Sequence, residues 1–338
     1  MYVLESFWSA AARLSGRLDL SSLVSVGLDP ATADDETLRH HGVSGQHLRR
    51  LREGIALETV ALPVRITDAR YPDLLRPLPH APPVLFLLGA LDLLLAPAVA
   101  IVGARRCSLL AERFARQLSG ATAAGGGVVV SGLAWGVDAA AHEAAGGRTI
   151  AVVGQSLDVP FAGSLRRRVG ALVEAGCLLV SEFPPRQRPD RWTFRQRNRV
   201  ISGLSQATVV VEAGERSGSL ITARCALDQG RELFVVPDHP AHPHSAGGLS
   251  LLEAGIPPLT SPAPLLELLQ LGPHKPRSPE GLLAMLSDLP DVTTLARRLD
   301  QPLRQVRQEL SALELDGRVV RLPGGRYGPA AQAPRRSP

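Results

Sequence analysis

The sequence predicts an α/β protein built around a doubly wound parallel sheet, with a small helical domain before it and a winged helix after it. Short apolar, valine-rich runs recur between about residues 63 and 260. A Gly, Ser or acidic turn and then a helical segment follow each run. The runs also lack the polar alternation of a half-exposed sheet. A parallel sheet covered by helices on both faces accounts for all three observations.

Six runs are expected to form the strands of this sheet. They lie at residues 98–102, 127–130, 149–153, 178–180, 207–211 and 233–236. In a doubly wound sheet, ligands bind outside the carboxyl ends of the strands. We therefore search for functional residues in the turns that follow these runs.

The flanking segments differ in composition from the sheet domain. Residues 1–62 are expected to form short helices, one of which begins with acids at positions 34–36, where they suit the helix dipole. Prolines after residue 261 predict a linker over residues 263–278, which would bound a sheet domain of residues 63–262. Residues 279–330 contain two helical segments and a basic hairpin turning at Pro323, the arrangement of a winged helix. Residues 331–338 are expected to be a disordered tail.

Composition favours a soluble, cytoplasmic protein. The chain has 338 residues, of which 45% are hydrophobic, and no apolar run reaches the roughly 20 residues of a membrane span. The N-terminus lacks the features of a secretory signal, so neither secretion nor a membrane anchor is expected. Cys107, Cys177 and Cys225 have no metal-ligand spacing, which favours a reducing compartment.

No cofactor or metal is expected. The glycine fingerprints of dinucleotide and nucleoside-triphosphate sites are absent. Three histidines in residues 239–244 have prolines between them and are more typical of a loop than of a metal site. His142 and Glu143 are adjacent in a predicted helix and therefore point in different directions, so they are not expected to form a catalytic pair.

A basic stretch at residues 191–205 is the most informative segment. Four arginines alternate with two aromatic residues, and no acid interrupts them: Arg191, Trp192, Phe194, Arg195, Arg197 and Arg199. Guanidinium groups bind phosphate oxygens, and a flat ring stacks on a base of any identity. The segment therefore suits a nucleic-acid strand, although an arginine-rich solvated helix face is the alternative. The net charge of +5 adds little, and Lys275 is the only lysine, which indicates a general bias toward arginine.

Three turns of the sheet domain are candidate anion-binding sites. The first strand is followed by Gly103-Ala-Arg-Arg-Cys-Ser108, the second by Ser131-Gly-Leu-Ala-Trp-Gly-Val-Asp138, and the fifth by Glu212-Ala-Gly-Glu-Arg-Ser-Gly-Ser-Leu-Ile-Thr-Ala223. Glycine and serine allow tight strand-to-helix turns whose free amides bind anions. The same residues also form ordinary turns, so each motif alone is weak.

Taken together, these motifs resemble the DNA-processing protein A (DprA/Smf) family. The resemblance rests on the three turns, on Tyr71-Pro, on Ser181-Glu-Phe-Pro-Pro and on Phe194-Arg-Gln-Arg-Asn-Arg-Val-Ile-Ser-Gly-Leu-Ser. Their order and spacing agree with the family over roughly the 200 central residues. The chain departs from the family in the segment beginning at Val159, at Asp238 and at Leu249. These departures affect loops away from the basic stretch.

The resemblance implies a Rossmann-like domain that binds single-stranded DNA during natural transformation and loads the RecA recombinase. It implies a homodimer, no enzymatic activity and a DNA site formed by the basic stretch and the turns. The predicted DNA-binding residues are Gly103, Arg105, Arg106, Ser108, Gly132, Arg191, Phe194, Arg195, Arg197, Asn198, Arg199, Ser217, Gly218, Ser219 and Thr222. Of these, Arg197, Asn198 and Arg199 are also expected to hold the turns together.

Two alternatives remain at this stage. A nucleotide phosphoribohydrolase has a similar core, but the turn at residues 214–222 lacks the family's glycine pattern and its downstream glutamate. A regulator of duplex DNA that acts through the winged helix is the second alternative.

Overall fold

The structure is a computed structural model. It describes residues 2–53, 57–238 and 245–271, and within the C-terminal part residues 286, 291–299, 306, 310, 313, 314, 318–322 and 326–329. The chain divides into two compact units, Met1–Gly272 and Pro273–Pro338. They are described separately.

An eight-stranded sheet forms the centre of the first unit, within the residues described there. Its strand order is β10-β9-β5-β6-β7-β8-β4-β3. The six predicted strands are parallel to one another: β5 (Ala98–Val102), β6 (Val128–Ser131), β7 (Thr149–Val152), β8 (Leu178–Ser181), β9 (Ala207–Val210) and β10 (Glu232–Val235). The predicted doubly wound parallel sheet is therefore confirmed.

One edge of the sheet is antiparallel, which the sequence analysis did not anticipate. Strand β4 (Val84–Gly89) pairs antiparallel with β8, and β3 (Leu62–Arg65) pairs antiparallel with β4. The chain between β3 and β4 is not a crossover helix, so the alternation of strands and helices does not extend to this pair. An antiparallel edge strand on a parallel sheet is common among large sheets.

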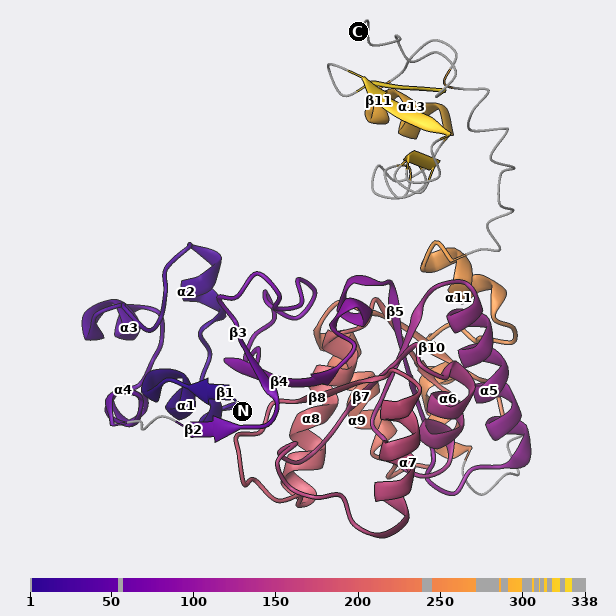
Figure 1. Cartoon of the computed structure of the whole chain (residues 1–338). Helices are drawn as coiled ribbons and strands as arrows, with labels where there is room; N and C mark the ends of the chain where they lie inside the picture. The colour runs from indigo at the N-terminus through magenta and orange to yellow at the C-terminus, as the bar shows by residue number, and fades with distance from the viewer. Residues whose placement is uncertain are drawn as a thin grey trace, which may run out of the picture. The chain divides into compact units, whose positions relative to one another are not determined.

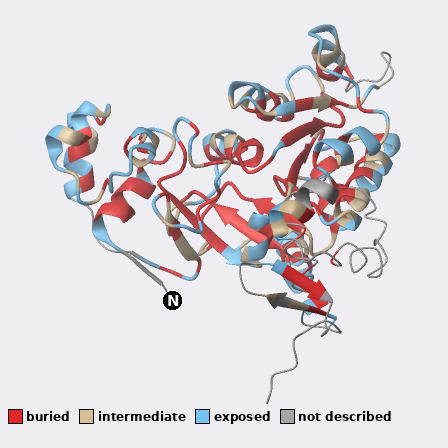
Figure 2. Cartoon of the chain, turned by 90° about the horizontal axis from the view of Figure 1, so that it is seen from above, coloured by how far each residue is buried: buried red, intermediate tan, exposed pale blue. Residues whose placement is uncertain are grey.

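Helices cover both faces of the sheet (Figure 1). They are α5 (Leu109–Ala124), α6 (Val137–Ala145), α7 (Gly163–Glu174), α8 (Arg191–Gly203), α9 (Ser219–Asp228) and α10 (Ala246–Glu253). Val99 and Ile101 pack in one core with residues of α5 and α6, whereas Ala100 and Val102 pack in the other with residues of α8 and α9. Strand side chains alternate between faces, so the two faces carry separate helix pairs. Figure 2 shows that the strands are buried and the outer helix surfaces exposed.

The N-terminal segment packs directly against the sheet domain. It contains α1 (Ser6–Arg13), α2 (Ser21–Ser25), α3 (Asp35–His40) and α4 (Gly45–Arg52). Its buried residues belong to the same core as those of the sheet, and α1 contacts β4. The predicted short helices are present. A two-stranded ladder of β1 (Tyr2–Leu4) and β2 (Leu57–Thr59) joins them, so the segment is not purely helical. A 3-10 helix, η1 (Leu91–Leu95), leads into β5.

The first unit continues past the predicted linker start at residue 263. Helix α11 (Ala263–Leu268) lies in that segment, and Leu265, Leu269 and Leu271 are buried in the core beside α5. Proline is tolerated in the first turn of a helix, so the prolines around residue 262 begin α11 and do not interrupt the fold. The sheet domain therefore extends to about residue 271, beyond the predicted boundary at 262.

The second unit contains a helix and a hairpin of the predicted winged helix. The helix is α13 (Val292–Leu299), and β11 (Val319–Leu322) pairs antiparallel with β12 (Arg326–Pro329). A small core joins them, made of Leu286, Leu295, Val306, Leu310, Leu313, Val319 and Tyr327. The predicted hairpin turn at residues 323–325 and the predicted tail at 331–338 lie outside the described residues. No helix among the described residues is long and apolar enough to span a membrane.

Candidate nucleic-acid interface

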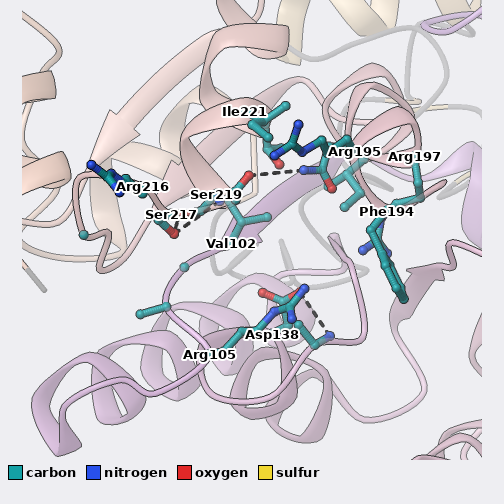
Figure 3. Close-up of a pocket in the computed structure, with 18 of the residues that line it drawn as sticks. Val102, Arg105, Asp138, Phe194, Arg195, Arg197, Arg216, Ser217, Ser219 and Ile221 are labelled. Atoms are coloured by element: carbon teal, nitrogen blue, oxygen red, sulfur yellow. Dashed lines mark hydrogen bonds between the residues drawn. The ribbon is translucent and has the colours of Figure 1, made fainter. Parts of the chain in front are cut away.

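The sheet reverses its winding between β5 and β9. From β5 the chain passes through β6, β7 and β8 on one side, and then returns to β9 on the other side of β5. At such a switch point the connections diverge and leave a crevice outside the carboxyl ends of the strands. A cavity of about 920 Å³ opens there, beyond Val102 at the end of β5 (Figure 3).

Four segments that are far apart in the sequence line the cavity: the turns that precede α5, α6 and α9, and helix α8 with its cap. Twelve of the predicted residues lie there: Gly103, Arg105, Arg106, Arg191, Phe194, Arg195, Arg197, Asn198, Ser217, Gly218, Ser219 and Thr222. Ser108, Gly132 and Arg199 do not line it. The role of each residue in DNA binding stays a prediction.

Two residues hold the turn after β5: Gly103 packs against α6, and Ser108 caps α5. A Cβ on Gly103 would lie 2.6 Å from Cγ2 of Val137, so glycine lets the turn approach α6 closely. The hydroxyl of Ser108 caps α5, and its amide donates to a carboxylate oxygen of Glu212 at 3.0 Å. Ser108 therefore joins the β5 turn to the β9 turn and does not face the cavity.

The turn before α6 is fixed by a buried carboxylate. Oδ2 of Asp138 accepts hydrogen bonds from the amides of Gly132 at 3.1 Å and Ala134 at 3.3 Å. Burial raises the pKa of Asp138. Gly136 has a φ of 71° and packs so closely on the carbonyl of Ala104 that a side chain would not fit. This turn is therefore rigid on both sides of Ala134, which lines the cavity.

Arg197 crosses the cavity wall into the interior. It is 5% exposed, and its Nη1 donates to the carbonyl of Gly132 at 2.7 Å and to the carbonyl of Val152. Burial lowers its pKa to about 10, while nearby Asp138 opposes that shift. A Cβ on Gly132 would lie 2.8 Å from the guanidinium group, so Gly132 leaves room for Arg197. The expectation that Arg197 ties the turns together is confirmed.

Helix α8 begins with a reciprocal cap at the rim of the cavity. Asp190 accepts from the amide of Thr193 at 2.8 Å, and the Thr193 hydroxyl accepts from the amide of Asp190 at 3.0 Å. Arg191, Phe194 and Arg195 are three and four residues apart and therefore share one face of the helix. All three line the cavity and are exposed.

The side of α8 next to its cavity face binds the rest of the protein. The buried carboxylate of Glu182 accepts from Arg199 at 2.6 Å, from the Ser15 hydroxyl at 2.6 Å and from Gln196 at 2.8 Å. Ser15 belongs to the N-terminal segment, so this network joins that segment to α8. The expectation that Arg199 is structural is confirmed, and its guanidinium group lies outside the cavity.

Trp192 also faces away from the cavity. Its ring lies edge-on to Phe183, with centroids 6.2 Å apart, and the guanidinium group of Arg17 lies 5.4 Å from its centroid. The sequence analysis offered Trp192 and Phe194 together as stacking surfaces. In the structure only Phe194 is at the cavity.

The turn before α9 is open toward the cavity. The hydroxyls of Ser217 and Ser219 are 2.7 Å apart, and Nδ2 of Asn198 donates to the Gly218 carbonyl at 3.2 Å. No atom beyond its neighbours lies within 4 Å of the position a Gly218 Cβ would take. The space beside Gly218 is thus open, although the amides of Ser217 and Ser219 already donate within the turn. Asn198 holds the turn to α8, as expected.

The sequence analysis missed Arg216 as a cavity residue. Arg216 and Glu215 are exposed in the turn before α9 and line the cavity. Both are part of the motif that was identified, and an arginine next to a Ser-Gly-Ser turn was the available signal. Asp138 and Asp190 also line the cavity and were missed, because their role is to fix turns.

The cavity carries a strong excess of available positive charge. Five of its arginines are exposed: Arg105, Arg106, Arg191, Arg195 and Arg216. None of them forms an ion pair with a carboxylate in the part of the chain that the structure describes. Phe194 is 38% exposed among them. This combination suits a ligand with several phosphates and an aromatic group.

No metal site is found among the described residues. The histidine-rich segment at residues 239–244 lies outside them. His142 is buried in α6, where its Nδ1 lies 2.7 Å from the Thr149 hydroxyl, and burial lowers its pKa to about 3. It is a neutral core residue and takes no part in the cavity.

Comparison with known families identifies the group. The family profile described as "DNA recombination-mediator protein A" matches residues 63–270, and that described as "DprA winged helix domain" matches residues 277–325. The chain belongs to the DprA family. The cavity lies wholly within the first match, and the second match confirms the predicted winged helix.

Relatives of the DprA family match most of the chain. Protein Smf of Escherichia coli is 40% identical over 276 residues, covering 75% of this chain and 74% of its own length. DNA processing protein DprA of Streptococcus pneumoniae is 40% identical over 203 residues, covering 58% and 70%. The family's DNA-processing role thus applies to the chain as a whole.

Two solved structures have a similar fold at 30% identity. That of DprA from Streptococcus pneumoniae gives a TM-score of 0.62 and covers 78% of this chain and 98% of its own. That of DprA from Helicobacter pylori gives 0.55, covering 63% and 94%, and is described as showing a single-stranded DNA binding mode.

Proposed function

We propose that this chain binds single-stranded DNA in the cavity between β5 and β9. The observation that carries the proposal is the group of five exposed arginines around the ring of Phe194, at the switch point of the sheet. The DprA relative from Helicobacter pylori, whose structure is described by its single-stranded DNA binding mode, supports the same ligand.

Each part of the cavity has a distinct role in this proposal. The five arginines neutralise phosphates, and Phe194 stacks on a base without selecting its identity. A further phosphate lies in the open space beside Gly218, where the positive end of the α9 dipole favours an anion. Arg197, Asn198 and Gly132 keep these parts at fixed distances, so the site is formed before DNA arrives.

The cavity favours a single strand over a duplex. A base in a duplex is paired and stacked, and its face is therefore unavailable to Phe194. In a single strand the base can leave its neighbours and enter a recess. The arginines do not make this distinction, because phosphates are present in both forms.

Binding, without catalysis, is the proposed activity. Asp138 and Asp190 are carboxylates at the cavity, and both accept hydrogen bonds that fix the turn before α6 or the start of α8. Neither is poised as a general base. The same proposal includes a cytoplasmic location, a homodimer, and a role in natural transformation in which the bound strand is transferred to the RecA recombinase.

A titration at several salt concentrations tests the proposal. Labelled poly(dT) should bind the full chain more tightly than a duplex of equal length. Its log K should fall linearly with log salt, by about 0.7 for each phosphate contact. Absence of single-strand binding, or tighter binding of the duplex, would reject the proposed function.

A further inference from the structure

Trp135 is an exposed aromatic residue that the proposed cavity does not use. It is 55% exposed, whereas Trp8 is buried and Trp192 packs against Phe183. The guanidinium group of Arg168 lies 4.0 Å from the centroid of the Trp135 ring. Both Trp135 and Trp192 are partly exposed, but Trp135 is the one in a turn that borders the cavity, where its free ring surface can stack on a ligand.

The turn that carries Trp135 is held in place. The carboxylate of Asp138 accepts from the amides of Gly132 and Ala134. Gly136 packs on the loop after β5. Nη1 of Arg168 donates to the carbonyl of Ala134 at 3.1 Å. Arg168 therefore fixes both the backbone before Trp135 and the ring itself. A ring fixed before binding loses little conformational entropy when a ligand stacks on it.

Trp135 is continuous with the cavity. Ala134 lines the cavity, and consecutive Cα atoms are about 3.8 Å apart. On the other side, Gly136 contacts the carbonyl of Arg105, an arginine of the cavity. An extended ligand that leaves the cavity past Ala134 thus meets Trp135 next.

The surface beyond Trp135 is cationic. Arg166 and Arg167 are exposed in the first half of α7, the helix that also provides Arg168. No acid precedes Glu174 in that helix. Neither arginine forms an ion pair with a described carboxylate. An aromatic ring followed by free guanidinium groups matches a nucleotide, with its base followed by its phosphate.

We propose that the single strand continues out of the cavity over Trp135, stacking one base on its ring and placing the next phosphate toward α7, beside the exposed Arg167 next to Arg168. This inference rests on the proposed function and adds a second binding subsite outside the cavity. The strand therefore leaves the cavity toward α7, and longer strands bind more tightly than strands that fill the cavity alone.

A ladder of dT oligonucleotides of increasing length, bound to the full chain, tests the subsite. Trp135→Ala should weaken binding of long oligonucleotides by roughly 5- to 150-fold, and should leave the shortest oligonucleotides that still bind unchanged. Trp135→Phe should retain most of the affinity, because it keeps a ring. Leu95→Ala is the matched control, since Leu95 is 65% exposed but lies before β5, at the opposite end of the sheet.

A second readout uses tryptophan emission in a Trp192→Phe background, where Trp135 is the only exposed tryptophan. Long oligonucleotides should quench the emission and the shortest should not. If the parent protein binds no oligonucleotide, the proposed function fails. The parent may bind while Trp135→Ala binds each oligonucleotide length as tightly as the parent does. In that case the subsite is rejected, and a lower melting temperature of the variant would mean that Trp135 only fixes the turn to α7.

Discussion

Helix α8 contains two groups of arginines, one exposed at the cavity and one bound to the protein, and the two groups have opposite roles. On the cavity face, Arg191 and Arg195 are exposed and have no carboxylate partner among the described residues. In contrast, Arg199 is paired with the buried Glu182, and the guanidinium group of Arg197, at the cavity wall, is bound to carbonyls of the interior. A charged side chain that is already paired and desolvated has little to offer a ligand, because binding would first have to break those contacts.

This difference shows that the basic stretch is both a scaffold and a binding surface. The inward arginines fix α8 against the turn before α6 and against the N-terminal segment. The outward arginines are then presented at a fixed place. Substitutions in the two groups of arginines should therefore separate stability from DNA binding.

Arg197→Ala should have the largest effect, and it should be on stability. Removing the side chain leaves the carbonyls of Gly132 and Val152 without their donor and Asp138 without its neighbouring positive charge. We expect the free energy of unfolding to fall by about 3–5 kcal/mol. Denaturant unfolding measures this, and Arg195→Ala serves as the control, with a change of about 0.5 kcal/mol or less. Equal losses of unfolding free energy in the two variants would mean that the bound and the exposed arginines of α8 do not differ in their contribution to stability.

Gly218→Asp should abolish tight DNA binding while the fold survives. Gly218 has helical backbone angles and open space around it, so an aspartate fits without strain. At a helix N-terminus it should stabilise by roughly 0.3–1 kcal/mol. A carboxylate at a phosphate position should nevertheless cost several kcal/mol of binding. Normal poly(dT) binding by the folded variant would mean that DNA does not use this turn.

Phe194→Ala should weaken single-strand binding by about 1–3 kcal/mol without changing its salt dependence, because stacking involves no phosphate. Trp192→Ala, on the other face, should leave poly(dT) binding of the folded protein much less affected. Fluorescence anisotropy at three or more salt concentrations measures both quantities. A flatter salt slope for Phe194→Ala would show that the ring acts by positioning an arginine.

Much of the fold could be predicted from the sequence, since buried parallel strands are continuous apolar runs and all six were identifiable. The antiparallel strands β3 and β4 could not be predicted, because no helix lies between them and the alternation of strands and helices therefore does not mark them. α11 was missed because its prolines resemble those of a linker, and only the packing of Leu265 and Leu269 shows that they begin a helix.

The segments that form the site could be predicted from the sequence, but which of their side chains line the cavity could be predicted less well. Motif order placed the turns at one edge of the sheet, since carboxyl ends of parallel strands meet there. Arg199 follows Arg191 and Arg195 at intervals of four residues and was therefore grouped with them, because its partner Glu182 lies in a distant segment after β8. Ser108 and Gly132 have the residue types of an anion-binding turn, but their contacts to Glu212 and Arg197 fix the turns and do not face the cavity.

The most direct test of the account compares Arg191→Ala with Arg199→Ala, two variants of the same residue type in α8, of which Arg191 lines the cavity and Arg199 is paired with Glu182. Both are titrated with dT oligonucleotides over a range of salt after circular dichroism has shown that they are folded. We predict that Arg191→Ala lowers the affinity and flattens the slope of log K against log salt by about 0.7, whereas Arg199→Ala keeps the parental slope. Equal slope changes in the two variants, or a change in Arg199→Ala alone, would contradict a DNA site on the cavity face of α8.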